Sequence, residues 1–152
     1  MKRGFLKTRV LETRAMLREL SENGAQVSHR QLDYGDWQGK SPEEVRVRWQ
    51  QLLTAWYEKP HTVYVPGGES LDDVRSRCGR ALKEIVAAHQ QSCVAIVAHT
   101  VVNRIILLVV MGLDNARFWH IRQDTCAINE IEVTGDAFTL VSMNDTCHLR
   151  LP

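Results

Sequence analysis

The stretch that decides the fold is Cys93-Val94-Ala95-Ile96-Val97-Ala98-His99-Thr100, which runs directly into the apolar segment Val101 to Gly112. The run of small and apolar residues predicts a strand that is buried on both faces, and a helical pattern follows with no linker. His99 is therefore expected at the carboxyl end of a buried strand, beside a helix amino terminus. Anions bind at such places because free backbone N–H groups and the helix dipole favour negative charge. A histidine there can contact a phosphate, or it can simply fill space in a turn.

Composition predicts one globular domain over residues 1–152. Hydrophobic residues make up 44% of the chain and charged residues 24%, enough for a substantial core. The net charge of +1 and the lack of a basic tail argue against nucleic acid and membrane surfaces as partners. No signal-peptide pattern is present, and the longest apolar run, Ile105 to Met111, is too short to cross a bilayer. We therefore expect a cytoplasmic protein.

The four cysteines form no C-x-x-C pair. Two of them, Cys93 and Cys126, lie in strand-like runs, so buried structural thiols are expected rather than a disulfide framework or a zinc site. No cluster with metal-ligand spacing is visible, and no cofactor is implied.

Capping signals and apolar periodicity predict the remaining elements. A helix is expected from Thr8 to Asn23, closed by Gly24. Ser41-Pro42-Glu43-Glu44 and Ser70 with its two following aspartates each predict a helix start. A helical turn is expected at 115–120. Two strands are expected near the carboxyl end, at 126–133 and 138–143, joined by a hairpin turn at 134–137.

This order of elements leaves the 93–98 strand short of partners. A strand of that character needs a neighbour on each edge, and the terminal hairpin supplies only one. No other apolar strand of that length is present. The domain is thus expected to lack its first strand, to be incomplete at the amino terminus, and to self-associate through an exposed sheet edge.

Five segments in order resemble the histidine phosphatase superfamily, also called phosphoglycerate mutase-like. Val97 to Arg104 is similar to its second-histidine motif, although Thr100 stands where the family usually has glycine. The other matches are Arg9 to Thr13 with an R-x-x-[EQ]-T helix start, Leu32 to Gly39 with "DFGDWEG", Pro66 to Ser70 with "PGGES", and Asn144 to Leu149 with the family's end. Together they span almost the whole chain.

The resemblance implies a three-layer α/β/α fold with a mostly parallel sheet and helices on both faces. The chain would correspond to the carboxyl-terminal part of that fold, incomplete at its amino terminus. The implied activity is hydrolysis of a small phosphorylated substrate through a phosphohistidine, a chemistry that needs no metal.

Carried over by position, His99 would be the second histidine and Arg9 a phosphate-binding arginine. Thr100 would donate its N–H or hydroxyl to the phosphate. Arg104, five residues past His99, is expected to be structural. Glu69 would be a proton donor or a substrate contact. Gln31 stands where the family often carries its acidic proton donor, and an amide cannot act as a general acid.

The family's defining Arg-His-Gly motif, whose histidine becomes phosphorylated, occurs nowhere in the sequence. Two hypotheses follow. The chain is either the larger part of a truncated phosphomonoesterase, inactive by itself, or a pseudoenzyme that binds a phosphorylated ligand or a partner. The long insertions of glycolytic mutases are absent, which favours a phosphatase over a mutase. The substrate stays open, although the short 40–66 segment favours a compact one.

Overall fold

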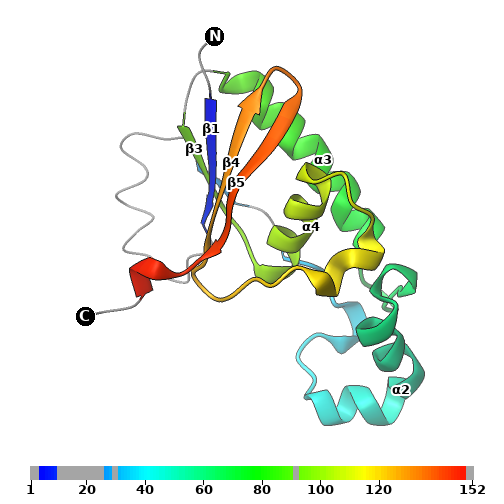
Figure 1. Cartoon of the computed structure of the whole chain (residues 1–152). Coiled ribbons are helices and arrows are strands. Elements are labelled where there is room, and N and C mark those ends of the chain that lie inside the picture. Colours follow the sequence, from blue (N-terminus) through cyan, green and yellow to red (C-terminus); the bar gives the residue numbers. More distant parts are fainter. Residues whose placement is uncertain (1–3, 10–25, 29–30, 91–92, 150–152) are drawn as a thin grey trace.

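The computed structural model describes residues 4–9, 26–28, 31–90 and 93–149. These residues build a five-stranded sheet with the order β2-β3-β1-β4-β5 (Figure 1). The β1–β3 and β2–β3 pairs are parallel, whereas β1–β4 and β4–β5 are antiparallel. The strands are β1 (Gly4–Arg9), β2 (Gln26–Ser28), β3 (Cys93–Val97), β4 (Ile128–Thr134) and β5 (Ala137–Asp145).

The central strand β1 corrects two sequence-based predictions. Thr8 and Arg9 end this strand instead of beginning a helix, and the rest of that predicted helix lies outside the described residues. Thr8 is paired with Ile96 of β3 on one side and with Asn129 of β4 on the other. The partner that β3 requires is therefore Gly4–Arg9, and the terminal hairpin lies one strand further out. Both edges of β3 are paired, so the exposed edge expected there is not present.

The prediction of an α/β domain is confirmed, but the sheet is mixed rather than mostly parallel among the described strands. Helices α3 (Leu71–Ala88) and α4 (Thr100–Val110) lie on the same side of the sheet (Figure 1). The expected layer of helices on the opposite face stays a prediction.

Local signals placed the helices well. Helix α2 (Pro42–Glu58) begins with a capping box in which the Ser41 side chain accepts from the Glu44 N–H and the Glu44 side chain accepts from the Ser41 N–H. Helix α3 begins with the same arrangement. Each box satisfies N–H groups that a helix start leaves without partners. The predicted turn at 115–120 is the 3-10 helix η3 (Asn115–His120).

The core lies between the sheet and the helices α3 and α4. Val94 and Ile96 of β3 are buried, as are Val74 and Cys78 of α3. Burial raises the pKa of the Cys78 thiol to about 11, which fits an inert structural thiol. Cys93, in contrast, is exposed, so the prediction of a buried thiol is wrong there. Cys93 is the first residue of β3, ahead of the point where the strand enters the core at Val94.

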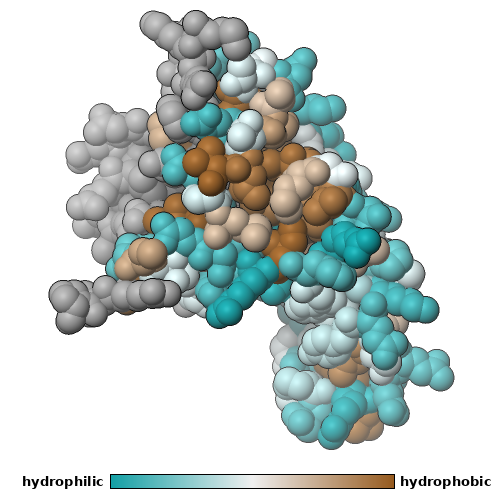
Figure 2. Space-filling model, in the orientation of Figure 1, coloured by the Kyte–Doolittle hydropathy of each residue, from teal (hydrophilic) through white to brown (hydrophobic). Residues whose placement is uncertain are grey.

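Residues 31–62 form a separate lobe, here called the α2 lobe, which lies beyond the lower ends of α3 and α4 in Figure 1, away from the sheet. Helix α2 bends within it, because Trp49 has φ −133° and ψ 42°, which are not helical angles. Figure 2 shows hydrophobic side chains gathered between the β4–β5 hairpin and the helices, whereas the surface of the α2 lobe is mainly hydrophilic.

Candidate active site

Two of the predicted site residues lie at one edge of the sheet. Arg9 is the last residue of β1, and His99 follows the end of β3 by two residues. Because Thr8 pairs with Ile96, Arg9 is level with Val97 on the neighbouring strand. Parallel strands β1 and β3 thus end at the same edge, and they bring the backbone of Arg9 close to that of His99. Crevices at the carboxyl ends of parallel strands are where α/β proteins bind ligands.

His99 is the residue that caps helix α4. Its side chain is exposed and makes no capping hydrogen bond, while its carbonyl accepts from the Asn103 N–H at 2.9 Å. The buried Asn103 amide also donates to the carbonyl of Ala98, at 3.3 Å. Asn103 therefore holds the turn from β3 into α4 through both its side chain and its backbone N–H. Nothing in the sequence pattern singled out Asn103 for this role.

The amino terminus of α4 differs in charge from those of α2 and α3. Helices α2 and α3 carry acidic residues in their first turns, whereas α4 carries none. Thr100, the first helical residue, is half-buried beside His99. A helix start without an acidic residue in its first turn favours an anion, which suits a phosphate near His99 and Thr100.

Glu69 is held by hydrogen bonds on both carboxylate oxygens. Its Oε1 accepts from Arg77 Nε at 3.0 Å, and its Oε2 accepts from Arg77 Nη2 at 3.2 Å and from the Asp33 N–H at 3.1 Å. Two hydrogen bonds from one guanidinium fix the position of the carboxylate. The geometry therefore supports a positioning role for Glu69.

Gln31 lies next to this pair. Its carbonyl accepts from Arg77 Nη2 at 3.3 Å, and its side chain is exposed. The structure thus brings the two candidate proton-donor positions, Gln31 and Glu69, together around one guanidinium.

Glycines explain why the two motif loops pack so closely. A Cβ on Gly68 would lie 2.4 Å from the Asp33 carbonyl oxygen, and one on Gly35 would lie 2.3 Å from the Pro66 carbonyl oxygen. Gly35 also has φ +47°, a conformation that disfavours other residues. Backbone hydrogen bonds of 2.9 Å from Asp36 N to Pro66 O, and from Glu69 N to Asp33 O, join the loops.

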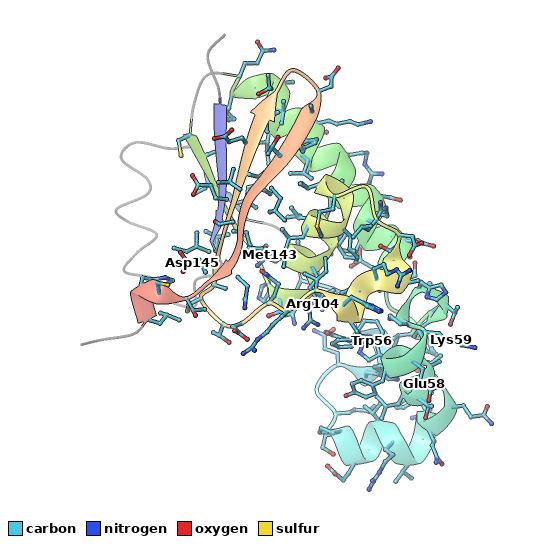
Figure 3. The ribbon with its side chains drawn as sticks, in the orientation of Figure 1. Trp56, Glu58, Lys59, Arg104, Met143 and Asp145 are labelled. Carbon is cyan, nitrogen blue, oxygen red and sulfur yellow. The ribbon has the colours of Figure 1, made fainter. Side chains whose placement is uncertain are left out.

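Arg104 occupies an aromatic environment, which fits its predicted structural role. Its guanidinium lies 5.1 Å from the ring centre of Phe118 and 4.7 Å from that of Trp119. Burial lowers the pKa of Arg104, and its Nε has no acceptor. Figure 3 shows Arg104 at the foot of α4, facing the α2 lobe that carries Trp56.

A buried amide network was missed by the sequence reasoning. Gln123 and Asn129 exchange hydrogen bonds of 3.0 and 2.7 Å, and Asn129 Oδ1 also accepts from the Asn144 N–H at 2.9 Å. Asn129 is opposite Thr8 in the sheet. The network fixes the strand ends beside Arg9, and no sequence signal marks it because its members are distant polar residues of ordinary types.

Within the described residues, no group of three or more His, Cys, Asp or Glu side chains is arranged to hold a metal ion. No helix in that part of the chain is long and apolar enough to cross a membrane.

An α/β sheet with a histidine at a strand end and helix start is a framework for anion chemistry, and comparisons with known proteins identify the family. The chain belongs to the histidine phosphatase superfamily (branch 1), whose model matches residues 9–146. The recognition made from the sequence motifs is thereby confirmed.

Phosphatases stand among the similar proteins. Phosphoserine phosphatase 1 of Hydrogenobacter thermophilus is 33% identical over 119 residues, which cover 78% of this chain and 56% of that protein. The 5''-phosphoribostamycin phosphatase of Niallia circulans is 29% identical over 115 residues, covering 72% of this chain and 54% of that protein. The chain thus spans a little over half the length of these relatives.

Solved structures share the fold. Bacillus stearothermophilus YhfR superposes with a TM-score of 0.84 at 19% identity, covering 99% of this chain and 100% of that one. The α-ribazole phosphatase from Shigella flexneri has a TM-score of 0.72 at 15% identity, with 94% and 96% covered.

Proposed function

We propose that this chain supplies the phosphate-binding part of a phosphomonoester hydrolase that works through a phosphohistidine. The observation that carries the proposal is the placement of Arg9 and His99 at the ends of adjacent parallel strands, beside the start of helix α4, whose first turn has no acidic residue. Family membership and phosphatases among the relatives support it.

In the proposed reaction a nucleophilic histidine attacks phosphorus in line with the ester oxygen. The N–P bond forms as the P–O bond breaks, and the leaving alcohol oxygen keeps the electron pair and takes a proton. Water then attacks phosphorus and gives up a proton, the N–P bond breaks with its electron pair returning to the histidine nitrogen, and inorganic phosphate is released. His99 and Arg9 would neutralise the equatorial oxygens in both steps, and Thr100 would donate a hydrogen bond to one of them.

The proton for the leaving alcohol is the open part of this scheme. Gln31 cannot supply it, and Glu69 is engaged with Arg77. We propose that Glu69 keeps the loop at Asp33 in place, and that it acts on the substrate only if the pair with Arg77 opens.

We further propose that the 152-residue chain by itself does not turn over. The ground for this proposal is that no Arg-His-Gly occurs in the sequence. Loss of a nucleophile removes nearly all of the acceleration that depends on it. A longer polypeptide carrying the nucleophile would be the working cytoplasmic phosphatase, and its substrate a small phosphorylated molecule.

Calorimetric titration of inorganic phosphate into the purified chain tests the binding part. His99→Asn is expected to weaken phosphate binding by about tenfold, since a lost charged hydrogen bond is worth about 1.5 kcal/mol or more. His61→Asn, an exposed histidine of the α2 lobe, is the matched control and should leave binding unchanged. Equal phosphate affinities for the wild type and His99→Asn would overturn the site assignment.

The rate of 4-nitrophenyl phosphate hydrolysis by the purified 152-residue chain tests the proposed inactivity. We expect this rate to equal that of the uncatalysed reaction without protein. Turnover by the purified 152-residue chain would refute it.

The alternative is a pseudoenzyme that binds a phosphorylated ligand or a partner. The intact mass of the native protein from its source separates the two. A mass well above 17.4 kDa, with Arg-His-Gly in the additional sequence, supports the phosphatase. A mass equal to that of this chain supports the pseudoenzyme.

A further inference from the structure

Arg104 carries a positive charge that no described residue neutralises. Its guanidinium faces the rings of Phe118 and Trp119, and no carboxylate or carbonyl in the described part of the chain accepts a hydrogen bond from it. The Nε atom is enclosed, but the two Nη groups are not, and the residue keeps part of its surface in solvent. A ligand can therefore reach the guanidinium at its Nη edge.

The hydroxyl of Tyr34 is the second polar group at this place. Burial raises the pKa of Tyr34 and the charge of Arg104 opposes that rise, so the two groups lie within range of each other's fields. Both belong to the aromatic cluster around Trp56. The Trp56 ring meets Tyr34 edge-on at 6.3 Å and Trp119 at 6.0 Å, and the guanidinium lies 4.7 Å from the Trp119 ring centre. The loop at Tyr34 and helix α4 thus bring a hydroxyl and a cation to one junction.

This junction lies close to the proposed phosphate site. Arg104 follows Thr100 by four residues, and residues four apart lie on the same face of a helix, with Cβ atoms about 5–6 Å apart. The side chain of a helical residue also leans back over the preceding turn, which here is the first turn of α4. Figure 3 shows Arg104 at the foot of α4, on the side where Trp56 lies. Arg104 is therefore placed to contact a ligand whose phosphate is held beside His99 and Thr100.

A half-buried cation without an acceptor favours the binding of an anion. Burial lowers the pKa of Arg104, because the charge has lost part of its water. A guanidinium edge matches a planar carboxylate, which can accept two parallel hydrogen bonds from it. One cation and one hydroxyl suit a singly charged carboxylate better than a doubly charged second phosphate.

We propose that the Nη edge of Arg104 and the Tyr34 hydroxyl bind a carboxylate of the substrate, one helical turn from its phosphate. This assignment rests on the proposed function and makes it more specific. The substrate class is a small phosphomonoester that also carries a carboxylate. Arg104 then selects the substrate in addition to packing against its aromatic neighbours.

Calorimetric titration of two matched probes into the purified chain tests the proposal. The first probe, 3-phosphonooxypropanoate, carries a phosphate and a carboxylate. The second, propyl phosphate, has a methyl group in place of the carboxylate. The wild type should bind 3-phosphonooxypropanoate about tenfold more tightly, as expected for one charge-assisted contact.

Three substitutions at the junction should reduce this difference. Arg104→Met removes the charge but keeps an unbranched side chain against the rings, so it should bind both probes as weakly as the wild type binds propyl phosphate. Arg104→Lys keeps the charge without the planar fork and should lose part of the difference. Tyr34→Phe removes only the hydroxyl, and it should weaken binding of 3-phosphonooxypropanoate about threefold while leaving propyl phosphate unaffected.

Arg48 offers a matched control, because its guanidinium lies 4.6 Å from the ring centre of Trp49 but is exposed on α2. Tyr64, which is 59% exposed, is the control for Tyr34. Arg48→Met and Tyr64→Phe should both keep the full difference between the probes. Circular dichroism checks that every variant is folded.

Equal affinities of the wild type for the two probes would overturn the carboxylate site and leave the proposed function intact. An undiminished difference in folded Arg104→Met would do the same. If Arg104→Met does not fold, undiminished differences in Arg104→Lys and Tyr34→Phe overturn the site instead. Failure of the wild type to bind propyl phosphate would overturn the proposed function, and the carboxylate site with it.

Discussion

Replacing Glu69 by glutamine tests whether the "PGGES" loop is held by an ion pair. The carboxylate accepts two hydrogen bonds from Arg77 and one from the Asp33 N–H, and the two side chains are only 16% and 19% exposed. Glu69→Gln removes the charge and turns one acceptor oxygen into an NH₂ donor. Hydrogen bonds to charged groups are worth about 1.5–3 kcal/mol each, and partial exposure and non-additivity reduce their sum. We expect the free energy of unfolding to fall by about 2–3 kcal/mol.

Urea unfolding followed by tryptophan fluorescence measures this loss, and the chain offers a control of similar geometry. Arg122 Nε lies 2.9 Å from Asp124 Oδ1, nearly the spacing of the Arg77–Glu69 pair, but its side chains are 79% and 37% exposed. Exposed pairs contribute little, so Arg122→Gln should cost less than about 1 kcal/mol.

An equally small loss for Glu69→Gln would refute the reasoning. It would show that the contacts of Glu69 with Arg77 and Asp33 do not hold the loop. Glu69 would then again be a candidate for the proton donor.

Three further predictions concern stability and association. Gly68→Ala should lower the free energy of unfolding by about 3 kcal/mol, because the new Cβ would meet the Asp33 carbonyl oxygen. Gly79→Ala in α3, with open space around it, should raise the free energy of unfolding by up to about 1 kcal/mol. Equal effects of the two substitutions in urea unfolding would contradict this. Hydrogen bonds from the Ser70 side chain and N–H hold the pKa of Asp73 below its ordinary value of 3.8. The stability that the ionised Asp73 contributes is therefore present above about pH 4, and it is lost as the pH falls through the lower pKa of the folded state. Asp73→Asn should therefore flatten the acid side of the Tm-against-pH curve, and an unchanged curve would argue against it. Strand β5 is the last strand of the described sheet, and its Val141 is half exposed. In sedimentation velocity the wild type should therefore associate as its concentration rises, and Val141→Lys should not. A wild type that stays monomeric at all concentrations would contradict association through β5.

The helices were predictable because their signals are local. The capping box at Ser41 and the one at Ser70 each lie within four consecutive residues, and each began a helix where predicted. The strand-to-helix turn at His99 was predictable for the same reason, since an apolar run and a helical period meet there without a linker.

The contacts that build the site are not local, and the sequence could indicate only their parts. "DYGDWQG" and "PGGES" were recognised as motifs, but the sequence did not show that they pack together. Their contact at Gly68 and the Asp33 carbonyl joins two loops that residues 40–65 separate in the sequence. The same holds for Arg77, whose guanidinium links Gln31 to Glu69. A motif can mark residues that matter without telling whether they bind a substrate or each other.

Strand β1 shows how tertiary demand overrides a weak local preference. Gly4–Arg9 has a short apolar pair followed by polar residues, so it gave no strand signal of its own. Strand β3 needs a partner on each edge, however, and β4 needs one on the side away from β5, and the sheet satisfies both with β1. This pairing changes the argument for Arg9. The resemblance put Arg9 in a helix start, whereas the register puts its backbone at the end of the strand beside β3. The phosphate contact proposed for Arg9 therefore depends on β1 keeping its register with β3, because a shift by one residue would change which β1 residue is level with Val97.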